Sequence, residues 1–176
     1  MVSQLEVSTL SRSSNSLAHG LVQVFTAPRR TFLTDVMAQA LRVAGQGQSV
    51  LVAQFLKGGI RQGSDHPISL VQRLDWLRCD LSRNLDETQP TPEEIAAIRD
   101  LWQQVVDRVQ SAQYELIVLD ELSLAIRLGA IDCKEVLDLL DRCPQHLDVI
   151  LTGPDVPQSL LDAADQITEV RRSRRS

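Results

Sequence analysis

The chain alternates short apolar runs with longer stretches in which apolar residues recur every three or four positions. Runs rich in Val, Ile and Leu are typical of buried strands, and the longer period is typical of helices packed on one face. The pattern predicts strands at Leu21–Phe25, Val50–Phe55, Trp76–Leu81, Tyr114–Leu119, Asp148–Gly153 and Ile167–Val170. It predicts helices at Thr31–Ala44, from Leu70 to the third strand, from the Thr91 cap through Val109, from Asp132 through Leu140, and at Pro157–Ala164.

This alternation predicts an α/β fold, doubly wound, with a mostly parallel sheet of five to six strands. The aromatic content is only 3%, so the core is aliphatic, as suits helices packed on a parallel sheet. We expect one α/β domain over residues 20–171. The Ser-rich residues 1–19 are interpreted as a mobile N-terminal arm, and residues 172–176 as a basic tail.

The overall charge and the cysteine spacing narrow the class of protein. Acidic residues outnumber basic ones, 23 to 18, so the surface as a whole repels nucleic acid. Three cysteines show no metal-ligand spacing, and no apolar run is long enough to span a membrane. We therefore expect a cytoplasmic protein with no membrane or nucleic-acid partner, and with a possible homodimer or protein partner left open.

The turn after the first strand stands where a phosphate-binding loop would be expected. Such loops read G-x-x-x-x-G-K-[S/T], because glycines let backbone N–H groups converge on phosphate and the lysine reaches its outer oxygens. Here residues 27–34 contain no glycine and no lysine, and Pro28 has no N–H to donate. Arg29, Arg30, Thr31 and Thr34 remain near the start of a helix, where an anion is favoured. They are candidate nucleotide-binding residues, against the alternative of a solvated turn.

Two acids follow the apolar strand that ends at Leu119. Asp120 and Glu121 have the position of a Walker B element, in which a carboxylate at the end of a strand holds Mg²⁺. They are candidate magnesium ligands. The alternative is that the acids only cap the following helix.

Several segments taken together resemble the cob(I)yrinic acid a,c-diamide adenosyltransferase family. They are Gly20–Thr26, Ala40–Gly47, Val52–Gly58 with its Gln-Phe-hydrophobic-Lys-Gly order, Leu116–Glu121 and Val149–Gly153. The resemblance implies a P-loop NTPase-like (RecA-like) fold and transfer of the 5′-deoxyadenosyl group of ATP to a reduced corrinoid. It also implies Mg-ATP and a corrinoid as ligands if activity is retained, and nucleotide-binding roles for Gln54 and Lys57.

The chain departs from this family in the loop itself. Family members carry Gly-[Asp/Asn]-Gly-Lys-Gly-Lys-[Ser/Thr]-Thr where this chain has Ala27–Thr34. Only Thr34 matches, whereas Phe32 replaces the second lysine and Leu33 the metal-side hydroxyl. Pro154 also stands where the family has Arg after Thr-Gly. We interpret the chain as having a degenerate Walker A loop.

Three functions are consistent with these observations. The chain is interpreted first as a non-catalytic binding or regulatory relative of the corrinoid adenosyltransferases. The second hypothesis is an active ATP:corrinoid adenosyltransferase of cobalamin biosynthesis, in which Arg29 and Arg30 supply the charge of the missing lysine. A purely structural or oligomeric partner protein is the third.

Overall fold

The computed structural model describes residues 9–11, 20–31, 33–58, 68–69, 73–85 and 89–171. The strands are β1 Thr9–Ser11, β2 Val22–Thr26, β3 Val50–Gln54, β4 Ile68–Ser69, β5 Leu74–Arg78, β6 Leu116–Asp120, β7 Asp148–Thr152 and β8 Gln166–Glu169. The helices are α1 Thr34–Gly45, α2 Pro92–Gln110, α3 Leu122–Arg127, α4 Cys133–Asp141 and α5 Gln158–Ala163.

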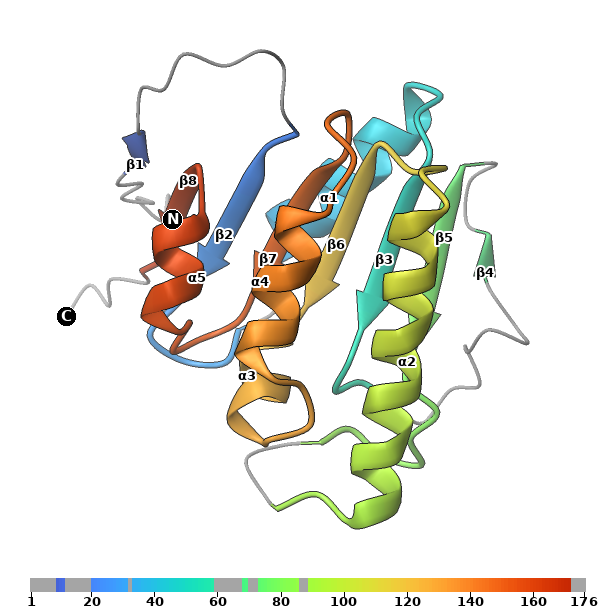
Figure 1. The fold of residues 1–176 in the computed structure, drawn as a ribbon, viewed down its shortest axis with the longest axis vertical. Helices are drawn as coiled ribbons and strands as arrows, with labels where there is room; N and C mark the ends of the chain where they lie inside the picture. Colours follow the sequence, from blue (N-terminus) through green and yellow to red (C-terminus); the bar gives the residue numbers. More distant parts are fainter. Residues whose placement is uncertain are drawn as a thin grey trace, which may run out of the picture.

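Within the described residues the strands form one sheet in the order β1-β8-β2-β7-β6-β3-β5-β4. The six strands from β8 to β5 are parallel, and β1 and β4 add short antiparallel edges. Helix α1 covers one face, while α2, α3, α4 and α5 cover the other (Figure 1). The predicted doubly wound α/β class is therefore confirmed.

The core follows the alternation of side chains along the strands. Residues 50 and 52 of β3 and 116 and 118 of β6 pack against α1. Residues 51 and 53 of β3 and 117 and 119 of β6 face the larger helical layer. Both faces of the central strands are buried, because a parallel sheet is covered on its two sides.

Several element boundaries differ from the sequence prediction. Helix α1 begins at Thr34 rather than Thr31, and Leu33 precedes it without a side-chain cap. Helix α3 was not predicted, because its six residues are too few to establish a helical period.

The segment around Leu70 also differs. Strand β4 pairs with β5 in antiparallel register, Ile68 opposite Trp76 and Ser69 opposite Asp75, just before the residue at which a helix was expected to begin. Residues 70–72 lie outside the described residues. Strand β5 runs over Leu74–Arg78, with Leu74, Trp76 and Arg78 alternating toward one face. After the strand the chain turns, and the N–H of Leu81 donates to the carbonyl of Cys79 at 2.9 Å.

The two ends of the chain were predicted as an arm and a tail. Three residues of the arm, Thr9–Ser11, pair with β8 as strand β1. Sheet pairing of so short a segment leaves no periodic pattern in the sequence. The rest of the arm, residues 1–8 and 12–19, lies outside the described residues, and so does the tail 172–176.

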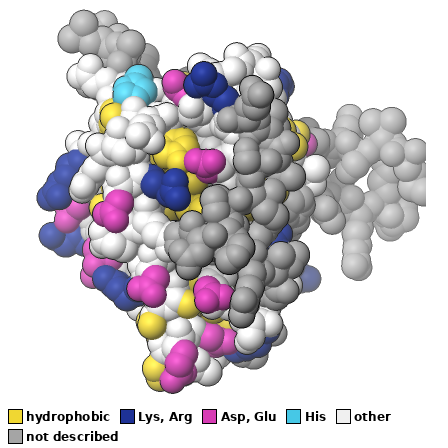
Figure 2. All heavy atoms as spheres, turned by 90° about the vertical axis from the view of Figure 1, so that its right-hand side faces the viewer, with side chains coloured by type: hydrophobic (Ala, Val, Ile, Leu, Met, Phe, Trp, Pro, Cys, Tyr) yellow, Lys and Arg dark blue, Asp and Glu magenta, His cyan; other side chains and the backbone are white. Residues whose placement is uncertain are grey.

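No helix in the described ranges is both long and apolar enough to cross a membrane. Figure 2 views the molecule from the side of β5 and β4 and shows positive and negative side chains interspersed over the visible described surface.

The central strand gives a direct test of this core. Leu119→Ala on β6 removes a side chain with no exposed surface and should lower the free energy of unfolding by about 3 kcal/mol. Leu41→Ala on α1, where the side chain is 42% exposed, is the matched control and should cost less than about 0.5 kcal/mol. Urea unfolding followed by circular dichroism measures both. Equal losses would contradict the assignment of Leu119 to the core.

Candidate functional site at the carboxyl edge of the sheet

Four neighbouring strands end in polar residues on the α1 side of the sheet. In β3 and β6, Gln54 and Asp120 continue the rows of apolar residues that pack against α1. Gln54 lies in register with Arg78 of β5 on one side and with Asp120 on the other. Thr152 completes the row at the end of β7. The carboxyl ends of parallel strands are where open α/β sheets bind their ligands.

Gln54 joins three strands through its side-chain amide. Its Nε2 donates to Asp120 Oδ2 at 2.7 Å. Its Oε1 accepts from Trp76 Nε1 and from Arg78 Nε, both at 2.9 Å. The side chain is 1% exposed, so each of these bonds lies in a site shielded from water. Gln54 therefore links β5 to β6 across β3.

Asp120 is buried and surrounded by donors. Its Oδ2 accepts from Lys57 Nζ at 2.8 Å as well as from Gln54, and its Oδ1 accepts from Thr152 Oγ1 at 2.9 Å. A buried carboxylate persists only if it is paired and hydrogen-bonded, since desolvation opposes its charge. The donors from β3, β7 and the segment after β3 meet that requirement.

Glu121 is held by the loop that was compared with a phosphate-binding loop. Arg30 donates from Nε and Nη2 to the two carboxylate oxygens of Glu121, at 2.5 and 2.7 Å. Its Nη1 donates to the carbonyl of Leu85. One guanidinium thus ties the loop after β2 to the end of β6 and to the loop after β5, in the bidentate geometry that makes such pairs strong.

The backbone at Glu121 is adapted to this contact. The residue has φ 61° and ψ 26°, a left-handed conformation that is uncommon for residues with a side chain. Its N–H donates to Thr152 Oγ1 at 2.9 Å. The turn takes the chain directly from β6 into α3 and leaves the Glu121 carboxylate facing Arg30.

A close backbone contact fixes the loop that carries Leu85. The Gly58 N–H donates to Asn84 Oδ1 at 3.1 Å, and the Leu85 N–H donates to the carbonyl of Leu56 at 2.9 Å. A Cβ at position 58 would collide with the carbonyls of Leu81 and Arg83, so this approach requires glycine.

The two acids were predicted as magnesium ligands. In this arrangement both oxygens of each carboxylate already accept from a donor within the described residues. No group of three or more His, Cys, Asp or Glu with the geometry of a metal site occurs among those residues. Arg30 and Lys57 already lie against these acids, so a Mg²⁺ ion would have to share a carboxylate with one of these cations. The magnesium role of Asp120 and Glu121 stays a prediction.

The structure brings together five of the eight residues singled out from the sequence: Arg30, Gln54, Lys57, Asp120 and Glu121. Arg29 and Thr34 are exposed, Thr34 being the first residue of α1, and Thr31 is half-buried. In the described part of the chain these three make no hydrogen bond or ion pair with the network.

Sequence reasoning missed three further members of the network: Trp76, Arg78 and Thr152. Thr152 ends an apolar strand in the same way as Asp120. This pattern could have predicted that Thr152 lies at the same edge of the sheet. Trp76 and Arg78 were not identified because the strand was predicted to begin at Trp76, two residues after the start of β5. The alternation of side chains along β5 was therefore not recognised.

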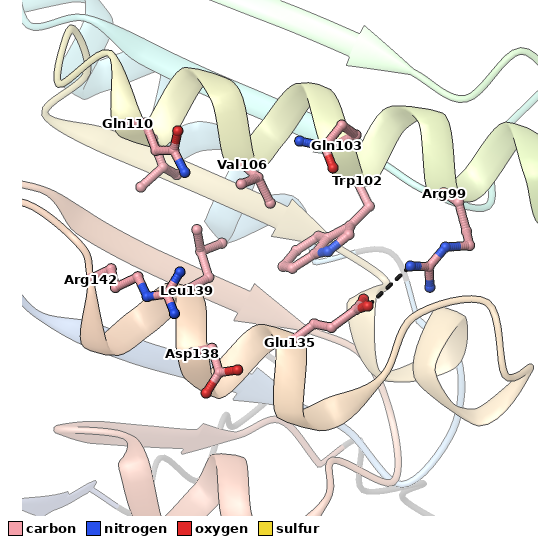
Figure 3. A pocket seen from close by; sticks show the side chains of 10 residues that line it. Arg99, Trp102, Gln103, Val106, Gln110, Glu135, Asp138, Leu139 and Arg142 are labelled. Carbon is pink, nitrogen blue, oxygen red and sulfur yellow. Dashed lines mark hydrogen bonds and ion pairs between the residues drawn. The ribbon is translucent and has the colours of Figure 1, made fainter.

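A separate hollow of about 270 Å³ lies between α2 and α4, on the opposite face of the sheet (Figure 3). Trp102, Val106 and Leu139 line it, and Arg99 Nη2 pairs with Glu135 Oε1 at 3.0 Å at one end. It shares no lining residue with the network around Asp120.

The comparison with protein families identifies the family to which the chain belongs. Residues 18–176 match the profile of the ATP:corrinoid adenosyltransferases BtuR/CobO/CobP. The chain belongs to this family. The corrinoid adenosyltransferase of Escherichia coli K12 is 26% identical over 160 residues, which cover 86% of this chain and 76% of that protein. The corrinoid adenosyltransferase CobA of Salmonella typhimurium LT2 is 28% identical with the same coverage. The resemblance inferred from the Gln54–Gly58 and Leu116–Glu121 segments is thereby confirmed.

A third relative, the Nostoc protein all2391, is 31% identical over 128 residues, which make up 69% of this chain and 34% of that protein. The identity is higher there, but the matched part of that protein is small. The family assignment therefore rests on the profile and on the adenosyltransferases.

The Arg30 contact should stabilise this family member measurably. Arg30→Gln leaves Glu121, which is 6% exposed, without its partner, so the free energy of unfolding should fall by about 2 kcal/mol at pH 7. Arg127→Gln breaks the solvent-exposed pair with Asp155 and should cost less than about 0.5 kcal/mol. Denaturant unfolding measures both changes. If the two variants lose the same small amount, Arg30 does not hold the loop.

Proposed function

We propose that this member of the corrinoid adenosyltransferase family binds a corrinoid at the carboxyl edge of the sheet and does not transfer an adenosyl group to it. The observation that carries the proposal is the bidentate pair between Arg30 and Glu121. Arg30, a cation of the chain itself, is bound to Glu121, the acid that a magnesium–nucleotide complex would be expected to approach. Because Arg30 neutralises Glu121, the charge of the site is balanced without a magnesium ion.

The loop also lacks the features that bind a triphosphate. Between Leu21 and Ala44 there is no glycine, so side chains stand wherever backbone N–H groups would have to converge on phosphate. Ala27 is buried and Pro28 has no donor. Leu33, at the position before α1, packs into the core and offers no hydroxyl to a metal ion.

Corrinoid binding is supported by what the chain retains. The relatives that cover most of the chain are named corrinoid adenosyltransferases. The loops after β3 and β5 are joined to each other at the ligand-binding edge through Gly58 and Asn84. Arg78, at one end of the polar row, is half-buried beside these loops and has further N–H donors, and a corrinoid carries amide and carboxylate groups around its rim.

The alternative is an active enzyme with a rebuilt loop. It is favoured by Asp120 and Glu121, which keep the positions of a Walker B element, and by Arg29, which is exposed close to the first turn of α1. A guanidinium can bind phosphate through two parallel hydrogen bonds. In that case Arg30 would have to exchange Glu121 for a nucleotide.

An adenosylation assay and a corrinoid-binding measurement distinguish the two proposed functions. Purified protein incubated anaerobically with Mg-ATP and reduced cobinamide should give no adenosylated product above a boiled control, as measured by chromatography with detection of the light-sensitive product. The same protein should retain cobinamide in equilibrium dialysis, and a corrinoid at 100 times its dissociation constant should stabilise the fold by about 2.7 kcal/mol. The Escherichia coli relative serves as the positive control for the assay.

A variant with the family loop provides the matched comparison. Replacing residues 27–34 by Gly-Asp-Gly-Lys-Gly-Lys-Ser-Thr should create Mg-ATP binding that the natural chain lacks, detectable by calorimetry. Catalytic turnover by the natural chain would establish the alternative. Failure to bind any corrinoid would refute the binding function.

A further inference from the structure

Arg78 lies at the carboxyl end of β5, beside Gln54, and its role is not explained by the contacts within the sheet. Its Nε donates to Gln54 Oε1 at 2.9 Å, and the side chain is half-buried. A guanidinium has five N–H donors. The remaining four have no protein acceptor among the described residues.

The orientation of Gln54 fixes this arrangement. The amide oxygen faces two N–H donors, from Trp76 and Arg78, whereas the amide nitrogen faces the Asp120 carboxylate. The reversed amide would place its NH₂ against two donors and its oxygen against an anion. Only one orientation of the Gln54 amide satisfies all three neighbours. Arg78 is therefore held by a rigid, buried partner, and this partner sets the direction of the outer guanidinium nitrogens.

The charge of Arg78 is also uncompensated. Three other cations near this edge are each paired with a carboxylate: Arg30 with Glu121, Lys57 with Asp120 and Arg83 with Glu94. Among the described residues no carboxylate oxygen lies within 4 Å of the Arg78 nitrogens. A half-buried, unpaired guanidinium at the ligand-binding edge of a sheet is suited to an anionic ligand group.

We propose that Arg78, positioned by Gln54, binds an oxyanion of the ligand. The planar fork formed by its outer nitrogens matches a carboxylate or a phosphate, two groups that share the same acceptor geometry. The proposal goes beyond corrinoid binding, because it identifies an anionic group on the ligand and the residue that receives it. It does not depend on whether adenosyl transfer takes place.

Calorimetry with defined probes tests it. The phosphate probes are inorganic tripolyphosphate and ATP, each without magnesium. The carboxylate probe is dicyanocobyrinic acid, and dicyanocobinamide, whose side chains are amidated, is its neutral counterpart. Arg78→Gln should weaken binding of the preferred oxyanion probe about tenfold at low salt, and Arg78→Lys should recover part of the loss because it keeps the charge without the fork. Binding of dicyanocobinamide should change less than twofold.

Arg73→Gln is the matched control, since Arg73 is exposed just before the amino end of the same strand. It should leave every dissociation constant unchanged. Thermal unfolding confirms that each variant is folded. Preference for dicyanocobyrinic acid identifies a carboxylate as the bound group, and preference for tripolyphosphate and ATP identifies a phosphate.

Two outcomes would overturn the proposal. One is that Arg78→Gln binds every oxyanion probe as tightly as the natural chain. The other is that the natural chain binds none of them. Oxyanion binding that does not depend on Arg78, together with intact binding of dicyanocobinamide, would overturn this proposal alone, whereas absence of binding to both corrinoids would count against the proposed function.

Discussion

The buried carboxylate of Asp120 is the constraint on which the carboxyl edge of the sheet depends. A charge with only 3% exposure is tolerated because Gln54, Lys57 and Thr152 donate to it from three separate segments. Those donors in turn fix their own surroundings. Gln54 orients Arg78 and Trp76, and Thr152 also receives the N–H of Glu121. One ionised group thereby organises the ends of four strands.

The charge of the second acid, Glu121, is balanced from within the chain. In nucleotide-binding proteins a metal ion and its phosphates bring the positive charge that acidic residues require. Here Arg30 provides that charge from within the chain and also binds the Leu85 carbonyl. The loop after β2 is therefore attached to the end of β6 and to the loop after β5.

Much of this arrangement could be predicted from the sequence, and the reasons for the failures are physical. The runs ending at Gln54, Leu119 and Thr152 are buried on both faces, so their composition alone indicated parallel strands. Asp120 and Glu121 were found because two acids at the end of such a run have the position of a Walker B element. The pairing of Arg30 with Glu121 joins residues 91 positions apart, and no local pattern encodes it.

The errors around β5 have a different cause. This strand is the outermost of the parallel set, and its residues Asp75, Trp76 and Arg78 are half-buried, so its hydrophobic signal is diluted. Shifting it by two residues concealed the alternation that directs Trp76 and Arg78 toward Gln54. Short elements such as α3 and β1 were missed because tertiary contacts stabilise them where intrinsic preference does not.

The electrostatics of the two acids also restrict what the site can recognise. Asp120 and Glu121 are adjacent and repel each other, but Lys57 and Arg30 neutralise them one for one. These four side chains together are therefore close to neutral. An anionic ligand gains little from Lys57 or Arg30 unless it first breaks a charged hydrogen bond, which costs about 1.5 to 3 kcal/mol for each bond lost. Recognition of negative charge is consequently left to a cation outside the two pairs, and the row that supports Asp120 places Arg78 at its end.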